Sequence, residues 1–271
     1  MDRKYLIQEI KTQKQMNRVD ELFRTNRKKI LSVFFTAGYP SIDSTAEIIR
    51  DLARAGVDMI EIGMPFSDPI ADGTVIQRSS EKALLNGMSV KQLFDQLTDI
   101  RKTVTIPLLL MGYINPVLKF GVENFCNKCT EIGIDGIIIP DLPPEIYLNQ
   151  YSGIFEKKDL INIFLITPQT DDERIRWIDS ISRGFLYLVS SHSITGMKGN
   201  FTEEQLSYFR RISKMNLKNP GIIGFGISDK KTFKSACDMA DGAIIGSAFV
   251  KMLTETGGGF ENIKKFVDDL I

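Results

Sequence analysis

The sequence lacks the features that several large classes of protein require. Its 34 basic residues equal its 34 acidic residues, so the global charge gives no reason to expect nucleic acid or an anionic membrane as a partner. No apolar run reaches the roughly 20 residues that cross a bilayer. The N-terminus has no apolar run and cleavage site of the secretory kind. We therefore expect a cytoplasmic protein.

Side chains for metal and redox sites are also scarce. Three cysteines do not form a disulfide framework, and His192 is the single histidine, so zinc has no reasonable ligand set. Cys126 and Cys129 form a C-x-x-C motif, which redox and metal sites also use. Two residues of one helix that happen to lie three positions apart explain the motif more simply. We expect no metal.

The chain does contain many short apolar runs, which alternate with longer amphipathic segments. Alternation of strands and helices predicts a parallel sheet. The length suits one α/β barrel, which typically needs roughly 250 residues. There are eight candidate strands, at residues 31–36, 59–62, 107–111, 136–139, 162–166, 185–189, 221–224 and 242–245.

A weak internal repeat favours a closed barrel over an open, doubly wound sheet, which is the alternative. A-G-V-D precedes the second strand, I-G-I-D precedes the fourth, and A-D-G opens the eighth. We predict an α/β fold, a single TIM (β/α)8 barrel domain over residues 1–271, with an extra N-terminal helix within residues 1–29 across its bottom. One outer helix is expected to begin with a capping box, Ser44-x-x-Glu47, and to end at Gly56.

The most informative stretch is residues 59–73, M-I-E-I-G-M-P-F-S-D-P-I-A-D-G. It begins as a buried strand with a carboxylate, Glu61, near its C-terminal end. That placement is costly unless the carboxylate is paired or functional, and the eight candidate strands contain no Lys or Arg to pair with it. Asp72 lies on the loop that leaves the strand, where it is also a candidate cap for a helix beginning near Thr74. The two form a candidate acid/base pair.

Two glycine-rich turns predict a phosphate site. G-F-G-I-S, residues 224–228, follows the seventh strand, and Gly246-Ser247 follows the eighth. Glycine lets the backbone approach an anion closely, and a helix N-terminus directs free N–H groups at it. In barrels the loops after strands seven and eight commonly hold phosphate, so we favour this interpretation over two ordinary turns.

Other residues after the strands have weaker interpretations. Residues 190–199 form a small polar loop that is either a mobile lid or a solvated connector. His192 within it is more simply a loop residue than a catalyst, since no serine has the G-x-S-x-G context of a hydrolase. Asp141 is more simply structural. A set of apolar residues at strand ends is either core or the lining of a flat aromatic pocket: Phe34, Met111, Ile138 and Phe225.

With these residues in view, the chain closely resembles the α-subunit family of tryptophan synthase over nearly its whole length. Residues 61–73 match the family pattern E-x-G-x-P-F-S-D-P-x-A-D-G almost position for position. Five further segments agree in order and spacing: F-T-A-G-Y-P from residue 35, Y-L-V-S from 187, I-T-G from 194, G-F-G-I-S from 224 and G-S-A from 246.

The resemblance implies a TIM barrel that cleaves indole-3-glycerol phosphate, by a retro-aldol reaction, to indole and glyceraldehyde 3-phosphate. Glu61 matches the general acid/base, and Asp72 matches the carboxylate that interacts with the indole N–H. Tyr187 matches the tyrosine beside the glutamate, and Thr195 the lid threonine that orients Asp72. The phosphate-binding positions match Gly196, Gly226, Gly246 and Ser247, and the indole pocket matches Phe34, Met111, Ile138 and Phe225.

The resemblance also implies a partner and a cofactor that this chain does not itself hold. The family's α subunit works in an α2β2 complex with a pyridoxal-phosphate β subunit that receives indole for tryptophan synthesis. The matching contact segments are residues 65–69 and the lid. Ser191-His192-Ser193 stands where some members carry Arg, Ser and Gly, which affects lid closure rather than the chemistry.

Three other functions compete with this interpretation. Another phosphate-binding barrel enzyme would need, for example, a catalytic Lys at a strand end, and the candidate strands contain none. A regulatory subunit without catalysis would not need Glu61 and Asp72. A stand-alone lyase that releases indole differs from a β-dependent subunit only in forming no stable complex.

Overall fold

The structure is a computed structural model that describes residues 16–24, 28–190 and 201–271. Eight parallel strands close into a barrel in chain order, β1 pairing with β8. This confirms the predicted TIM barrel. Each predicted strand lies within one residue of the observed bounds, which are β1 (Ile30–Thr36), β2 (Met59–Gly63), β3 (Leu108–Met111), β4 (Gly136–Ile138), β5 (Ile161–Ile166), β6 (Leu186–Val189), β7 (Gly221–Gly224) and β8 (Gly242–Ile245).

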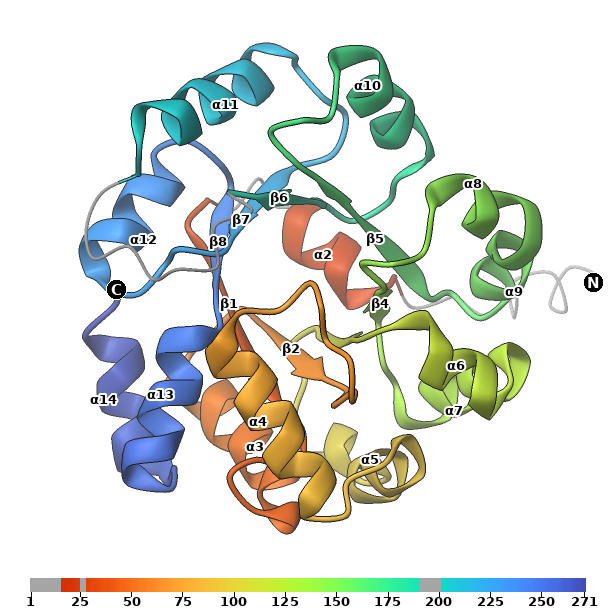
Figure 1. Ribbon diagram of the computed structural model, residues 1–271, viewed down its shortest axis with the longest axis vertical. Coiled ribbons are helices and arrows are strands. Elements are labelled where there is room, and N and C mark those ends of the chain that lie inside the picture. The colour runs from red at the N-terminus through yellow and green to blue at the C-terminus, as the bar shows by residue number, and fades with distance from the viewer. Residues whose placement is uncertain (1–15, 25–27, 191–200) are drawn as a thin grey trace, which may run out of the picture.

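Helices surround the strands, as Figure 1 shows, and α14 at the C-terminal end packs beside α3. The helices are α2 (Arg18–Arg24), α3 (Thr45–Ala55), α4 (Thr74–Leu85), α5 (Val90–Leu97), α6 (Ile114–Phe120), α7 (Val122–Ile132), α8 (Pro144–Ile146), α9 (Ser152–Lys157), α10 (Asp172–Ile181), α11 (Glu203–Lys214), α12 (Lys230–Cys237), α13 (Ser247–Thr256) and α14 (Phe260–Asp268).

The apolar core has two parts because side chains alternate along each strand. One set faces outward and packs against the helices. The other set fills the barrel interior, as in other barrels of eight strands. Its strand residues include Ile30, Met59, Leu109, Tyr187 and Ile222.

The repeat seen in the sequence has a structural purpose at the N-terminal ends of the strands. Asp58, Asp135 and Asp241 precede or open β2, β4 and β8, and the carboxylate of each accepts a backbone N–H near the start of the preceding strand. The three distances lie between 2.8 and 2.9 Å. Each aspartate therefore ties two neighbouring strands together at the bottom of the barrel.

The N-terminal helix crosses this bottom end, as predicted for the described part of residues 1–29. Asn17 donates to the Asp135 carbonyl at 2.9 Å, and Arg18 forms an ion pair with the Asp135 carboxylate. Val19 is completely buried against the barrel interior. Residues 1–15 and 25–27 lie outside the described residues. The helix α2 closes the end of the barrel opposite the predicted site.

The helix predicted between Ser44 and Gly56 begins and ends where expected, but its predicted capping box is wrong. Ser44 precedes α3 with helical backbone angles, and its hydroxyl donates to the carbonyls of Tyr39 and Ser41 rather than capping α3. The predicted capping box is therefore absent, because a 3-10 turn occupies this position. Gly56 ends α3 in the left-handed region (φ 97°), and its N–H bonds to carbonyls of the last turn.

The two cysteines of the C-x-x-C motif lie in the apolar core between the strands and the surrounding helices. Cys126 and Cys129 are buried in α7, and burial raises the pKa of both thiols. The simpler interpretation, two residues of one helix, is confirmed. Across the described residues, no three His, Cys, Asp or Glu side chains gather as metal ligands do. In the same part of the chain, no helix has the length and apolarity to cross a membrane.

Candidate active site

Glu61 lies inside the barrel, at the third of the five positions of β2. It pairs in register with Phe34 on β1 and Leu109 on β3, both interior residues, and it is 0% exposed. Its Oε1 accepts a hydrogen bond from Ser32 Oγ at 2.8 Å, and its Oε2 is buried without a hydrogen-bond partner. Burial disfavours the charged form and raises the pKa of Glu61 to about 8. Glu61 therefore carries a proton at neutral pH.

Asp72 lies on the loop between β2 and α4, half-buried. Its Oδ2 accepts a hydrogen bond from the hydroxyl of Tyr113 at 3.2 Å. Burial raises the pKa of Asp72 to about 6, and the Tyr113 hydrogen bond opposes that rise. The predicted cap is wrong, because Gly73 is the N-cap of α4 and no side chain caps this helix. The Asp72 carboxylate is ionised at neutral pH.

Tyr187 on β6 lies near both carboxylates. It is 3% exposed within the interior cluster, and its pKa is raised first by burial and then by the nearby charges of Glu61 and Asp72. Its ring lies directly over Gly224 on β7, where an added Cβ would be 2.2 Å from the ring. Glycine at position 224 is therefore what leaves room for the Tyr187 ring.

The four residues predicted for the indole pocket come together. Phe34, Met111 and Ile138 belong to the same interior cluster as Tyr187, and Phe225 packs against it. Phe225 has φ 70°, a strained conformation for a bulky residue that costs about 1–3 kcal/mol. The hydroxyl of Ser190 holds this turn by donating to the Phe225 carbonyl at 2.8 Å. The strain directs an aromatic ring toward Tyr187, with ring centroids 6.2 Å apart.

The two glycine-rich turns differ in a way that the sequence does not reveal. After β7, Asp229 caps α12 and accepts the backbone N–H of Thr232, so a carboxylate already occupies that helix N-terminus. After β8, Gly246 is the N-cap of α13, with no side-chain cap, and Ser247 is exposed. Of these two helices, α13 thus has the N-terminus open to an anion, and Gly226 (φ 76°) lies exposed on the neighbouring turn.

Some predicted residues fall outside the described residues, namely Thr195, Gly196, His192 and the rest of the loop after Ser190. Asp141 has the structural role expected, since its Oδ1 accepts the backbone N–H of Ile114 at 2.9 Å. Sequence analysis missed Tyr113 and Ser32. Tyr113 lies two residues after the strand at 108–111, so the rule that functional groups follow strands would have found it.

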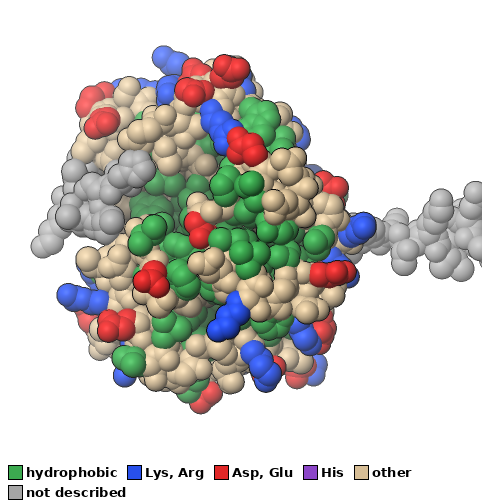
Figure 2. Space-filling model, turned by 45° about the vertical axis from the view of Figure 1, so that its right-hand side comes forward, with side chains coloured by type: hydrophobic (Ala, Val, Ile, Leu, Met, Phe, Trp, Pro, Cys, Tyr) green, Lys and Arg blue, Asp and Glu red, His purple; other side chains and the backbone are tan. Residues whose placement is uncertain are grey.

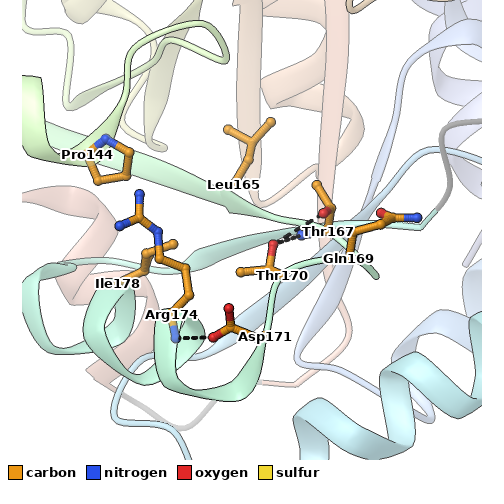
Figure 3. Close-up of a pocket in the computed structure, with 8 residues that line it drawn as sticks. All are labelled: Pro144, Leu165, Thr167, Gln169, Thr170, Asp171, Arg174 and Ile178. Atoms are coloured by element: carbon orange, nitrogen blue, oxygen red, sulfur yellow. Dashed lines mark hydrogen bonds between the residues drawn. The ribbon is translucent and has the colours of Figure 1, made fainter.

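A separate open pocket of about 520 Å³ lies at the C-terminal end of β5 and contains none of the predicted site residues. Figure 3 shows Arg174 and Asp171 along its α10 side and Thr167 and Thr170 across from them. Arg174 is engaged in an ion pair with Glu145. Leu165 is the lining residue that also packs against the interior cluster. The carboxylate pair lies elsewhere, on β2 and on the loop that leaves it.

This fold and site define a class: (β/α)8-barrel enzymes with one carboxylate inside the barrel and a second on the loop that leaves the same strand. Residues 21–269 match the family model described as tryptophan synthase alpha chain. The chain belongs to the tryptophan synthase alpha chain family. It is accordingly a carbon–carbon lyase of tryptophan biosynthesis that cleaves indole-3-glycerol phosphate to indole and glyceraldehyde 3-phosphate.

Individual relatives are similar in sequence to this chain over almost their full lengths. The tryptophan synthase alpha chain of Flavobacterium psychrophilum is 60% identical over 94% of this chain and 100% of its own. That of Bacteroides thetaiotaomicron is 53% identical over 94% and 100%. Among solved structures, the alpha subunit of Legionella pneumophila str. Paris is similar with a TM-score of 0.83 and 33% identity, covering 94% of this chain and 97% of that one.

Proposed function

We propose that Glu61 and Asp72 divide the proton chemistry of this cleavage between them. The supporting observation is that two buried carboxylates beside one tyrosine have raised pKa values that differ, about 8 for Glu61 and about 6 for Asp72. Between these values one group is protonated and the other is charged. Such a separation is how one site supplies both an acid and an anion at neutral pH.

The steps balance with these two groups alone. Protonated Glu61 gives its proton to C3 of the indole ring, and the cation that results is stabilised by the charged Asp72 at the ring N–H. The Glu61 carboxylate then takes the proton of the glyceryl hydroxyl. The bond between C3 and the glyceryl carbon breaks, its electron pair returns to the ring, and indole and the aldehyde are released. Glu61 ends protonated, as it began.

The rest of the site orients the substrate. Phe34, Met111, Ile138 and Phe225 provide an apolar surface for the indole ring, and Tyr187 lies beside Glu61. The phosphate would bind at the uncapped start of α13, at Gly246 and Ser247, with Gly226 on the adjoining turn. This non-reacting group contributes binding energy that holds the reacting end in place. Thr195 and Gly196 remain predictions from the resemblance.

The proposal needs no cofactor in this chain, since proton transfers suffice for the cleavage. Pyridoxal phosphate would belong to the β subunit. All three cysteines are free thiols, which suits the reducing cytoplasm that we propose as the location. We also propose that the whole chain, residues 1–271, is a single domain.

We propose that the β subunit docks on the loops that follow β2, β3 and β4, forming an α2β2 complex. Large apolar side chains are exposed after each of these three neighbouring strands: Ile70 (83%), Leu118 (47%) and Ile146 (39%). Figure 2 shows hydrophobic side chains gathered across the middle of one face of the molecule, with charged side chains mostly toward its edge. Exposed apolar groups that lie together indicate an interaction surface.

Indole release from indole-3-glycerol phosphate tests this function, with and without a tryptophan synthase β subunit. We expect cleavage that β stimulates and that Glu61→Gln lowers by about 10²–10⁴-fold, the usual contribution of a general acid/base. Glu123→Gln, on the exposed surface of α7, is the matched control and should retain activity. A folded wild-type chain that releases no indole under either condition would overturn the proposal.

The pH dependence gives a second test. Activity requires ionised Asp72 and protonated Glu61, so the rate of cleavage should be highest between about pH 6 and about pH 8 and fall on both sides. A profile that rises continuously through pH 9 would contradict the role of Glu61 as an acid.

A further inference from the structure

Tyr113 holds the loop that carries Asp72 through two hydrogen bonds of one hydroxyl group. Tyr113 lies two residues after the end of β3, as the N-cap of α6, and is 5% exposed. Its hydroxyl donates to Asp72 Oδ2 at 3.2 Å and accepts the backbone N–H of Ala71 at 2.9 Å. The same oxygen thus contacts the Asp72 side chain and the peptide unit just before it.

The ring and backbone of Tyr113 are held in place as well. The ring stacks on Phe66, at the beginning of the same loop, with centroids 5.0 Å apart and an interplanar angle of 28°. The next residue, Ile114, donates its N–H to Asp141 Oδ1, so the loop after β4 supports the segment that carries Tyr113. Groups from the loops after β2 and β4 therefore hold the segment that carries Tyr113. Support of this kind holds a functional side chain in a precise orientation.

We propose that Tyr113 is a positioning residue for the lyase reaction, whose hydroxyl holds the Asp72 carboxylate in its orientation and favours its charged form. This inference rests on the proposed function and deepens it. Tyr113 acts through Asp72, and nothing in the proposal requires it to touch the substrate.

Among the groups around Asp72, the Tyr113 hydroxyl is the one that favours the charged form of Asp72. Burial opposes charge on Asp72, and the Tyr113 hydroxyl is the group that opposes this effect. The other titratable groups nearby are acidic: Glu61 acts with Asp72 on Tyr187, and Asp141 acts on Tyr113. Among the described residues, no Lys or Arg is recorded in an ion pair with Asp72. Removal of the hydroxyl should therefore raise the pKa of Asp72 further.

The test compares Tyr113→Phe with the wild type in the indole-release assay across pH. Phenylalanine keeps the stack on Phe66 and removes only the hydroxyl. We expect kcat near neutral pH to fall about ten- to a hundredfold, the loss typical of a hydrogen bond to a charged group, while KM changes much less. The acid limb of the pH profile should move to higher pH, so the loss should be greater at pH 6 than at pH 8.

Two controls separate positioning from a purely structural role. Tyr208→Phe removes another buried tyrosine hydroxyl, which donates to the Ile166 carbonyl at 3.0 Å, and should leave the profile unchanged. Phe66→Leu removes the stack but keeps the hydroxyl, so it should lower kcat without moving the acid limb. An acid limb in Tyr113→Phe at the wild-type position would overturn the proposal.

A measurement without turnover keeps this inference distinct from the proposed function. Carboxyl-carbon NMR of the intact chain, with Asp72→Asn to assign the signal, reports the titration of Asp72 directly. We expect the titration midpoint to rise in Tyr113→Phe and to stay in place in Tyr208→Phe. Equal midpoints in all three proteins would refute the role of Tyr113 even if the wild type releases indole. A raised midpoint in a chain that releases none would uphold it while the proposed function fails.

Discussion

The two ends of this barrel use the same chemical group, a carboxylate, in opposite ways. At the bottom, Asp135 is 2% exposed and accepts hydrogen bonds from a strand N–H, Arg101 and Arg18. In the interior on the other side, Glu61 is 0% exposed with one hydrogen bond and one oxygen that has no partner. Burial costs the charged form in both places, but only Asp135 has cations to compensate. The satisfied carboxylate stabilises the fold, and the unsatisfied one is the group that we propose as the acid.

The largest expected effect concerns the cost of Glu61 to stability as pH rises. The unfolded chain loses this proton near its ordinary value of 4.5, but the folded chain holds it until about pH 8. Folding stability due to Glu61 is therefore fully present below about pH 4.5 and is lost progressively up to about pH 8. The loss is on the order of 1.4 kcal/mol per unit between the two pKa values, since that is the free energy of one unit.

Urea unfolding at pH 5, 7 and 9 measures this effect. Glu61→Gln removes the titration, so the variant should lose less stability than the wild type between pH 5 and pH 9. If both proteins lose the same amount, Glu61 is not protonated in the fold and the contrast between the two ends fails.

At the bottom end, Asp135→Ala should cost stability and not chemistry. The substitution leaves Arg101 and a strand N–H without their buried partner, which typically costs about 3–5 kcal/mol. The activity per folded molecule should stay at the wild-type value, because this end lies away from the site. The control is Lys91→Ala, which breaks an exposed pair with Asp95 and should cost about 0.3–0.5 kcal/mol. A loss of kcat in folded Asp135→Ala would show that the ends are coupled.

A smaller effect is expected from Gly224→Ala, which tests whether the position of the Tyr187 ring matters. The new methyl would lie 2.2 Å from the Tyr187 ring, so the ring must shift away from Glu61. We expect a loss of about 1–3 kcal/mol of stability from overpacking and a lower kcat. Gly153→Ala is the matched control, since nothing lies within 4 Å of its added Cβ. Wild-type activity in Gly224→Ala would mean that the position of Tyr187 is unimportant.

The smallest effect is expected from Ser32→Ala, which removes the one hydrogen bond that Glu61 has. Because this bond lowers the pKa of Glu61, its loss should move the basic limb of the pH–activity profile to higher pH. Stability should change by about 1 kcal/mol, the usual value for one hydrogen bond. Ser182→Ala, which removes a buried hydroxyl that donates to the Ile178 carbonyl, should leave the profile in place. An unmoved basic limb in Ser32→Ala would show that this bond does not tune Glu61.

Predictions from sequence succeeded where a local pattern and the barrel topology agree. The strands were located within one residue because each is a short apolar run bounded by turns. Glu61 stood out because a lone carboxylate in such a run has no local explanation. The predictions of side-chain caps failed at Ser44 and Asp72, since each side chain has a choice of partners. Ser44 bonds to carbonyls before its helix, and Asp72 accepts from Tyr113, 41 positions away.

The sequence by itself determined the alternation of strands and helices, the family, and the two carboxylates that we propose for the chemistry. Only the tertiary structure decided how each carboxylate is solvated and which group holds it. Among the described residues, Asp135 has cations beside it and Glu61 has none, and Tyr113 reaches Asp72 from another loop. The N-terminus of α13 is open, whereas that of α12 is capped. These differences depend on which strand ends become neighbours. Local sequence specifies the donors and acceptors, and closure of the barrel selects which of them meet.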